Sequence, residues 1–139
     1  FLEGSAGMIV EVVGAVIRDQ AGRVLTVRKR GTQRFMLPGG KHEPGEDDAT
    51  ALARELREEL GVDVATATLL GRFEAPAANE AGATVRSTAY RVEIDGEPAI
   101  QAEIEELLWI DPKAPPDVPI APMLTGRIFP SLNGEGQAA

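Results

Sequence analysis

The sequence contains no cysteine, which excludes a disulfide framework, a thiolate nucleophile and a cysteine-ligated zinc site. It also lacks any apolar run of ~18 residues and any signal-peptide pattern, so we expect no membrane association and a cytoplasmic protein. Basic residues are scarce, since 14 Lys and Arg stand against 22 Asp and Glu, for a formal net charge of −8. A chain this acidic is not expected to bind a nucleic-acid backbone. Local cations or metal ions must therefore hold any phosphate group that it binds.

What the sequence does contain is enough apolar material for one globular domain. Hydrophobic residues make up 43% of the 139 residues and charged residues 26%. We expect a single domain over residues 8–132. Residues 1–7 resemble residual cloning sequence before Met8, and residues 133–139 are Gly- and Ala-rich, which predicts a flexible tail.

The pattern of apolar and turn-forming residues predicts strands on both sides of one helix. Residues 10–18 and 23–30 are expected to form a hairpin around the turn signal at 19–22. A Gly- and Pro-rich loop follows, and loops of this length tend to be functional. Further strands are expected at 68–75, 84–94 and 106–111, with a short helix near 123–128. This order predicts a mixed α/β fold built around the central helix.

The central helix is expected to span residues 48–60. Its apolar stripe follows the 3.6-residue period and comprises Ala49, Leu52, Ala53, Leu56 and Leu60. Acidic residues at 47 and 48 suit a helix N-terminus, and Gly61 supplies a C-terminal stop.

Three glutamates of this helix, Glu55, Glu58 and Glu59, stand at i, i+3 and i+4 and therefore lie side by side. One interpretation is a solvated acidic face, softened by the neighbouring Arg54 and Arg57. The other is a site for a hard divalent cation, because Mg²⁺ and Mn²⁺ prefer carboxylate and carbonyl oxygen and bridge to phosphates.

The surrounding residues favour the cation site. Gly40, Glu46, Arg54, Glu55, Leu56, Glu58, Glu59, Gly61 and Val62 occupy the spacing G-x5-E-x7-R-E-U-x-E-E-x-G-U, where U is a bulky apolar residue. This segment resembles the Nudix box at every defined position, and the preceding Leu37-Pro38-Gly39 also resembles the family's lead-in. Phe35 stands where many members carry tryptophan.

The resemblance implies an α/β/α sandwich with a mixed central sheet and a MutT-like Nudix hydrolase that cleaves a diphosphate linkage. It implies that Mg²⁺, or Mn²⁺, is held by Glu55, Glu58, Glu59 and the carbonyl of Gly40. Arg54 would orient the glutamates, and Glu46 would have a structural role. A glutamate would take the proton of the attacking water, and the candidates are Glu58, Glu59 and Glu103, with Glu105 and Glu106 as alternatives to Glu103.

The substrate is left open by the box. A nucleoside triphosphate is the leading expectation, from the resemblance to short MutT-like enzymes. Pro76 lies near where ADP-ribose-cleaving members often carry a proline, so ADP-ribose is an alternative substrate. Dinucleoside polyphosphates are another. A nucleotide-binding module without catalytic activity is a further alternative. Isopentenyl diphosphate isomerisation would need a cysteine. Arg28, Arg30, Lys41 and Gly39 are expected to meet substrate phosphate. A homodimer is possible by resemblance, while His42 and Trp109 are expected to be a loop side chain and a core residue.

Overall fold

The computed structural model of the chain describes residues 8–78 and 81–138. The described elements follow in this order: β1 (Ile9–Val16), β2 (Val24–Lys29), β3 (Gly39–Gly40), α2 (Asp48–Leu60), β4 (Asp63–Pro76), β5 (Thr84–Asp95), β6 (Ile104–Ile110), a five-residue π-helix η1 (Leu124–Ile128) and α3 (Phe129–Ala138). The residues expected to be cloning sequence, 1–7, lie outside the described part of the chain.

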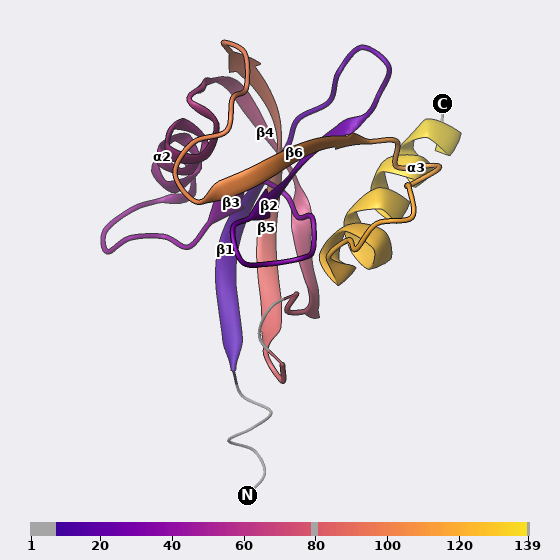
Figure 1. The fold of residues 1–139 in the computed structure, drawn as a ribbon, viewed down its shortest axis with the longest axis horizontal. Coiled ribbons are helices and arrows are strands. Elements are labelled where there is room, and N and C mark those ends of the chain that lie inside the picture. The colour runs from indigo at the N-terminus through magenta and orange to yellow at the C-terminus, as the bar shows by residue number, and fades with distance from the viewer. Residues whose placement is uncertain (1–7, 79–80, 139) are drawn as a thin grey trace, which may run out of the picture.

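The strands form two sheets between two helices. The larger sheet has the order β3-β1-β5-β4, in which β1 and β5 are parallel and the other neighbours antiparallel. The antiparallel pair β2-β6 forms the second sheet. Helices α2 and α3 lie on opposite sides of these strands (Figure 1). The expected α/β/α sandwich with a mixed central sheet is confirmed.

The expected hairpin between residues 10–18 and 23–30 is wrong in its pairing. The turn forms, and Leu25 donates its N–H to the carbonyl of Ile17, but beyond it β1 and β2 lie in different sheets. Strand β1 is flanked by β3 on one edge and β5 on the other. Because both edges of β1 are already occupied, β2 pairs with β6 instead.

Helix α2 begins and ends where the sequence predicts. The side chain of Asp47 caps the first turn by accepting the N–H of Thr50 at 2.9 Å, and Gly61 ends the helix at φ 68°. Its buried face differs from the expected stripe. Ala49 and Ala53 are exposed, whereas the buried positions are Ala51, Leu52, Leu56, Glu59 and Leu60. The face in contact with the core therefore includes one of the three glutamates.

The C-terminal segment is helical as far as Ala138, which includes most of the residues 133–139 that were expected to form a flexible tail. The helical backbone continues from Leu124 through η1 and α3 to Ala138. Leu124, Ile128, Phe129 and Leu132 are buried in one hydrophobic cluster together with residues of β1, β2 and β5. Packing of this apolar face against the sheets supplies the stability that the Gly-rich sequence lacks as an isolated helix.

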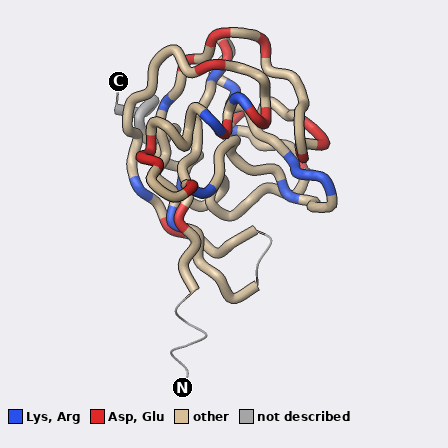
Figure 2. Tube along the Cα trace, turned by 90° about the vertical axis from the view of Figure 1, so that its left-hand side faces the viewer, with Lys and Arg blue, Asp and Glu red and all other residues tan. Residues whose placement is uncertain are grey.

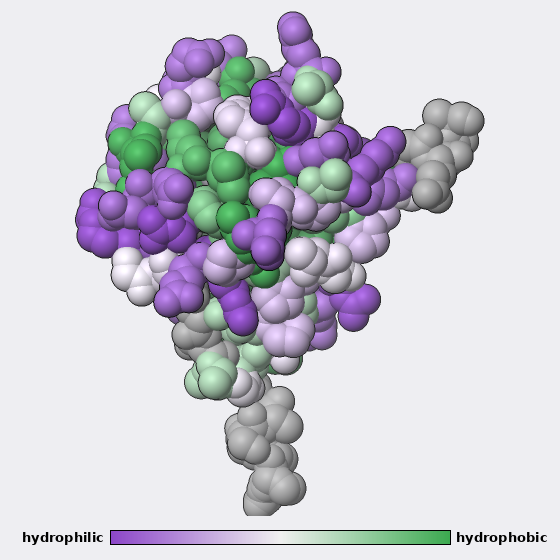
Figure 3. Space-filling model, turned by 45° about the vertical axis from the view of Figure 1, so that its right-hand side comes forward, coloured by the Kyte–Doolittle hydropathy of each residue, from purple (hydrophilic) through white to green (hydrophobic). Residues whose placement is uncertain are grey.

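The surface carries charges of both signs. Acidic and basic positions are interspersed along the described chain (Figure 2), and the face in Figure 3 shows apolar residues in a central area bordered by hydrophilic ones. Neither α2 nor α3, in the part of the chain that the structure describes, has the length and apolar character of a membrane-spanning helix.

Candidate active site

The two glycines before α2, called the glycine turn here, form the short edge strand of the larger sheet. Gly39 and Gly40 form β3 and pair with Gly14 and Val13 of β1. Gly39 has φ 143°, and a Cβ there would collide with the carbonyl oxygen of Val13. A Cβ on Gly40 would stand 2.5 Å from Oε2 of Glu55. Only glycines bring the main chain this close to the sheet and to the glutamate.

Glu59 is the most deeply buried acid near this turn. Its side chain is 2% exposed, and Oε1 accepts the main-chain N–H of Gly39 at 3.2 Å. Its other oxygen, Oε2, is buried and has no hydrogen-bond partner. Burial, reinforced by the neighbouring charge of Glu55, raises the pKa of Glu59 to about 8, while the bond from Gly39 and the charge of Lys29 act in the opposite direction.

Arg54 joins the box residues through its guanidinium. It donates to both oxygens of Glu46 at 2.6 and 2.9 Å and to the carbonyl of Lys41 at 3.0 Å. It also donates to Glu55 at 3.2 Å and to Glu58 at 3.3 Å. Hydrogen bonding from Arg54 lowers the pKa of Glu46 to about 2. The planar fork of arginine suits this arrangement because it serves several carboxylates from fixed directions.

The three helix glutamates have different surroundings. Glu55 approaches Gly40 and Glu59 is turned inward, whereas the Glu58 side chain is 54% exposed and contacts Arg54. Within the described residues, no three His, Asp or Glu side chains converge into a group that could hold a metal ion. The oxygen-only donor set and the orphaned Oε2 of Glu59 nevertheless fit a hard divalent cation beside Glu55 and Gly40.

The loop after the glycines is tied to the sheet by a short hydrogen-bonded chain. Tyr90 on β5 donates to Oδ2 of Asp48 at 2.6 Å, and Nε2 of His42 lies 2.7 Å from Oδ1 of the same carboxylate. These bonds lower the pKa of Asp48, and the bond to Asp48 is the main cause that raises the pKa of Tyr90 to about 12. His42 therefore has a carboxylate partner, which the sequence alone did not indicate.

The cations expected to meet phosphate are spread over different environments. Arg28 is bound to Glu106 and Arg30 to Glu105. Lys41 is exposed. Lys29, the last residue of β2, lies in the wall of a pocket with its Nζ 3.8 Å from Oε2 of Glu103. Alternation along a strand separates neighbouring side chains, and this was the signal that could have singled out Lys29, although the strand is irregular between Arg28 and Lys29.

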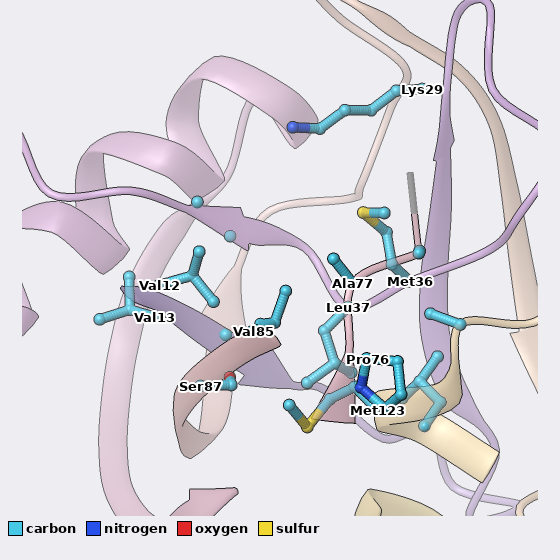
Figure 4. Close-up of a pocket in the computed structure, with 16 residues that line it drawn as sticks. Val12, Val13, Lys29, Met36, Leu37, Pro76, Ala77, Val85, Ser87 and Met123 are labelled. Carbon is cyan, nitrogen blue, oxygen red and sulfur yellow. The ribbon is translucent and has the colours of Figure 1, made fainter. Parts of the chain in front are cut away.

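This pocket connects the glycine turn to an apolar interior and has a volume of about 210 Å³. Gly39, Gly40 and Lys29 lie in its wall, and Lys29 extends its amino group toward a helix (Figure 4). Away from that end the lining is mostly apolar, with Met36, Leu37, Pro76, Val85 and Met123 shown in Figure 4. A concave apolar cavity with a few polar groups at one end is the usual form of a small-molecule site.

Comparison of the chain with known proteins identifies its family. The NUDIX domain family matches residues 8–127. A CTP pyrophosphohydrolase of Escherichia coli is 32% identical over 120 residues, which cover 82% of this chain and 84% of that protein. An 8-oxo-dGTP diphosphatase of Haemophilus influenzae is 40% identical over 70 residues, which cover 48% of this chain and 52%, about half, of that protein. The solution structure of the E. coli ORF135 protein superposes with a TM-score of 0.74 at 27% identity, covering 94% of this chain and 93% of that one.

The family match and these relatives identify the chain as a hydrolase that acts on phosphorus-containing anhydrides. The chain belongs to the NUDIX domain family, and its relatives include MutT-like pyrophosphohydrolases.

Proposed function

We propose that the protein is a Mg²⁺-dependent pyrophosphohydrolase of nucleoside triphosphates. The observation that carries the proposal is the position of the pocket, which opens onto Gly39 and Gly40, where the helix glutamates meet the main chain. A base in the apolar part and phosphates at the polar end would bring the diphosphate linkage to Glu55 and Glu59. The names of the two relatives, which refer to CTP and 8-oxo-dGTP, support a triphosphate as the substrate class.

The divalent cation would be held by the carboxylates of Glu55 and Glu59 and the carbonyl of Gly40. Glu58 would become a further ligand once its hydrogen bond from Arg54 is broken. When bound, such a cation neutralises phosphate charge and makes water a stronger nucleophile. Mn²⁺ would suit the same oxygen donors. The carboxylate of Glu59 is already oriented by Gly39, and Arg54 holds Glu55 and Glu58 in position.

The proton of the attacking water needs a carboxylate that water can reach. Glu59 is too deeply buried to act on a water molecule and would instead hold the cation. Glu58 and Glu103 are more accessible, with side chains 54% and 61% exposed. We therefore assign general-base catalysis to one of these two. Lys29, next to Glu103, would neutralise substrate phosphate, together with Lys41 and with Arg28 or Arg30 after release from their acidic partners.

The test is pyrophosphate release with Mg²⁺ across a panel containing CTP, 8-oxo-dGTP, ADP-ribose and a dinucleoside tetraphosphate. We expect triphosphates to give nucleoside monophosphate and pyrophosphate, and Glu59→Gln to lower kcat/KM by at least a hundredfold. Glu97→Gln, an exposed glutamate outside the site, is the matched control. Preferred cleavage of ADP-ribose would move the assignment to nucleoside-diphosphate derivatives. Tight nucleotide binding without any turnover would favour a binding module.

The roles of Glu58 and Glu103 are separated by comparing Glu58→Gln with Glu103→Gln over a pH series. The general-base variant loses the acidic limb of the kcat profile, whereas the other variant retains that limb. Full activity of both variants would contradict the assignment.

A further inference from the structure

The pocket lining contains one polar side chain from the larger sheet, that of Ser87. It lies on β5 between Val12 of β1 and Phe73 of β4, and it is 3% exposed. Lys29 and Ser87 are the only residues of the pocket lining with a polar side-chain group. Figure 4 shows Ser87 beside Val85 and away from Lys29.

Ser87 lines the pocket at a buried position of β5, with Val12, Val85 and Leu37 in the same lining. The environment around it is apolar, and burying a hydroxyl in such a place is unfavourable unless it finds a hydrogen-bond partner. A polar group therefore stands at a position where packing alone would favour alanine or valine. Its exposure to the pocket gives it access to a ligand.

Gly14 keeps this hydroxyl accessible. A Cβ on Gly14 would stand 3.3 Å from Oγ of Ser87 and 3.1 Å from Cδ1 of Leu37. Both contacts are tighter than ordinary packing, so a side chain at this position would press on Ser87 and Leu37. Gly14 lies on β1 in the pocket wall, and its missing side chain leaves the space in front of Ser87 open.

We propose that Ser87 is a specificity-determining residue that hydrogen-bonds the polar edge of the substrate's base, with Gly14 providing the room for that edge. The proposal rests on the proposed nucleotide substrate. A flat base would contact the apolar side chains of Met36, Leu37 and Met123, and its ring nitrogen, carbonyl or amino group would meet the hydroxyl. Because a serine hydroxyl both donates and accepts, it pairs with either kind of group.

The experiment compares the wild type with Ser87→Ala, Ser87→Thr and Thr88→Ala on CTP, on 8-oxo-dGTP and on an abasic deoxyribose 5′-triphosphate. Thr88 is the adjacent residue on β5, is not part of the pocket lining, and is the control for loss of a hydroxyl. We expect Ser87→Ala to lower kcat/KM for the better nucleotide about tenfold, the value of one hydrogen bond. For the abasic triphosphate, kcat/KM of Ser87→Ala should differ from that of the wild type by less than twofold. Ser87→Thr should retain most of the activity on nucleotides.

Gly14→Ala should reduce kcat/KM for nucleotides more than for the abasic compound. Calorimetric Kd values for the corresponding nucleoside monophosphates, measured on the same variants, test the contact without turnover. Equal losses on nucleotide and abasic substrate, or no loss with Ser87→Ala, would overturn the proposal. An inactive wild type that still binds nucleotide tenfold more tightly than Ser87→Ala would contradict the proposed function and support the role of Ser87. A wild type that binds no nucleotide would overturn both.

Discussion

The main-chain N–H of Gly39 donates a hydrogen bond of 3.2 Å to the buried carboxylate of Glu59. Through this contact the turn preceding the Nudix helix and the last turn of the helix itself are held together, although they are 20 residues apart. The contact depends on the backbone conformation of Gly39, φ 143°, which residues other than glycine rarely adopt.

Replacement of Gly39 by alanine should therefore damage both stability and activity. The added Cβ would meet the carbonyl of Val13, and the unfavourable φ adds further strain. We expect the free energy of unfolding in urea to fall by roughly 1–3 kcal/mol. Gly126→Ala, at an open position, serves as the control. An unchanged denaturation midpoint for Gly39→Ala would show that the turn does not require glycine.

Tyr90 offers a direct spectroscopic check of the loop geometry because it is the only tyrosine in the sequence. Its bond to Asp48 raises the pKa of the phenol to about 12, since the neutral hydroxyl is the form that donates. We expect the phenolate absorbance to titrate well above the ordinary value of 10.0 in the wild type and to move back toward it in Asp48→Asn. Asp63→Asn is the control. A wild-type midpoint near 10.0 would refute the contact.

The pairing of Glu46 with Arg54 should give a defined acid dependence of stability. The pKa of Glu46 is lowered from 4.5 to about 2, so its folded state binds fewer protons than the unfolded state between these values. The stabilising contribution is complete above about pH 4.5 and is lost as the pH falls toward 2. The difference in unfolding free energy between wild type and Glu46→Gln should shrink across this window. A difference that stays constant with pH would argue against the ion pair.

Lys29 should matter more to catalysis than its neighbour Arg30. Lys29 lies in the pocket wall, whereas Arg30 is 65% exposed and pairs with Glu105. We expect Lys29→Gln to lower kcat/KM for a triphosphate about tenfold, the loss expected for one charge-assisted phosphate contact. Arg30→Gln should change it less than twofold. A larger loss of kcat/KM in Arg30→Gln than in Lys29→Gln would indicate that Arg30, and not Lys29, contacts the phosphate.

The sequence predicted the features that depend on local chemistry. Helix α2 was found to the residue because Asp47 and Gly61 cap it. Pairing between strands was not predictable in the same way. The turn at 19–22 suggested a hairpin, but the partners of β1 are set by β3 and β5, which lie elsewhere in the sequence.

Burial was also difficult to anticipate where function overrides the usual preference for apolar interiors. Glu59 is buried although hydrophobic periodicity left it outside the apolar stripe of α2, and Ser87 is buried in an apolar pocket. The Gly-rich residues 133–139 were expected to form a flexible tail. The helix α3 that includes most of them is anchored by the buried side chains of Phe129 and Leu132, and this packing cannot be read from the local sequence. In each case the deciding contact comes from a distant part of the chain.

Glu59 and the glycine turn are proposed to form a cation site at which a triphosphate is cleaved. The most direct measurement is pyrophosphate release from CTP and 8-oxo-dGTP by the wild type, Glu59→Gln and Glu97→Gln, each with Mg²⁺ and with excess chelator. We predict turnover by the wild type and Glu97→Gln only when Mg²⁺ is present, with at least a hundredfold loss in Glu59→Gln. Undiminished pyrophosphate release by Glu59→Gln, or by the wild type in chelator, would contradict this account.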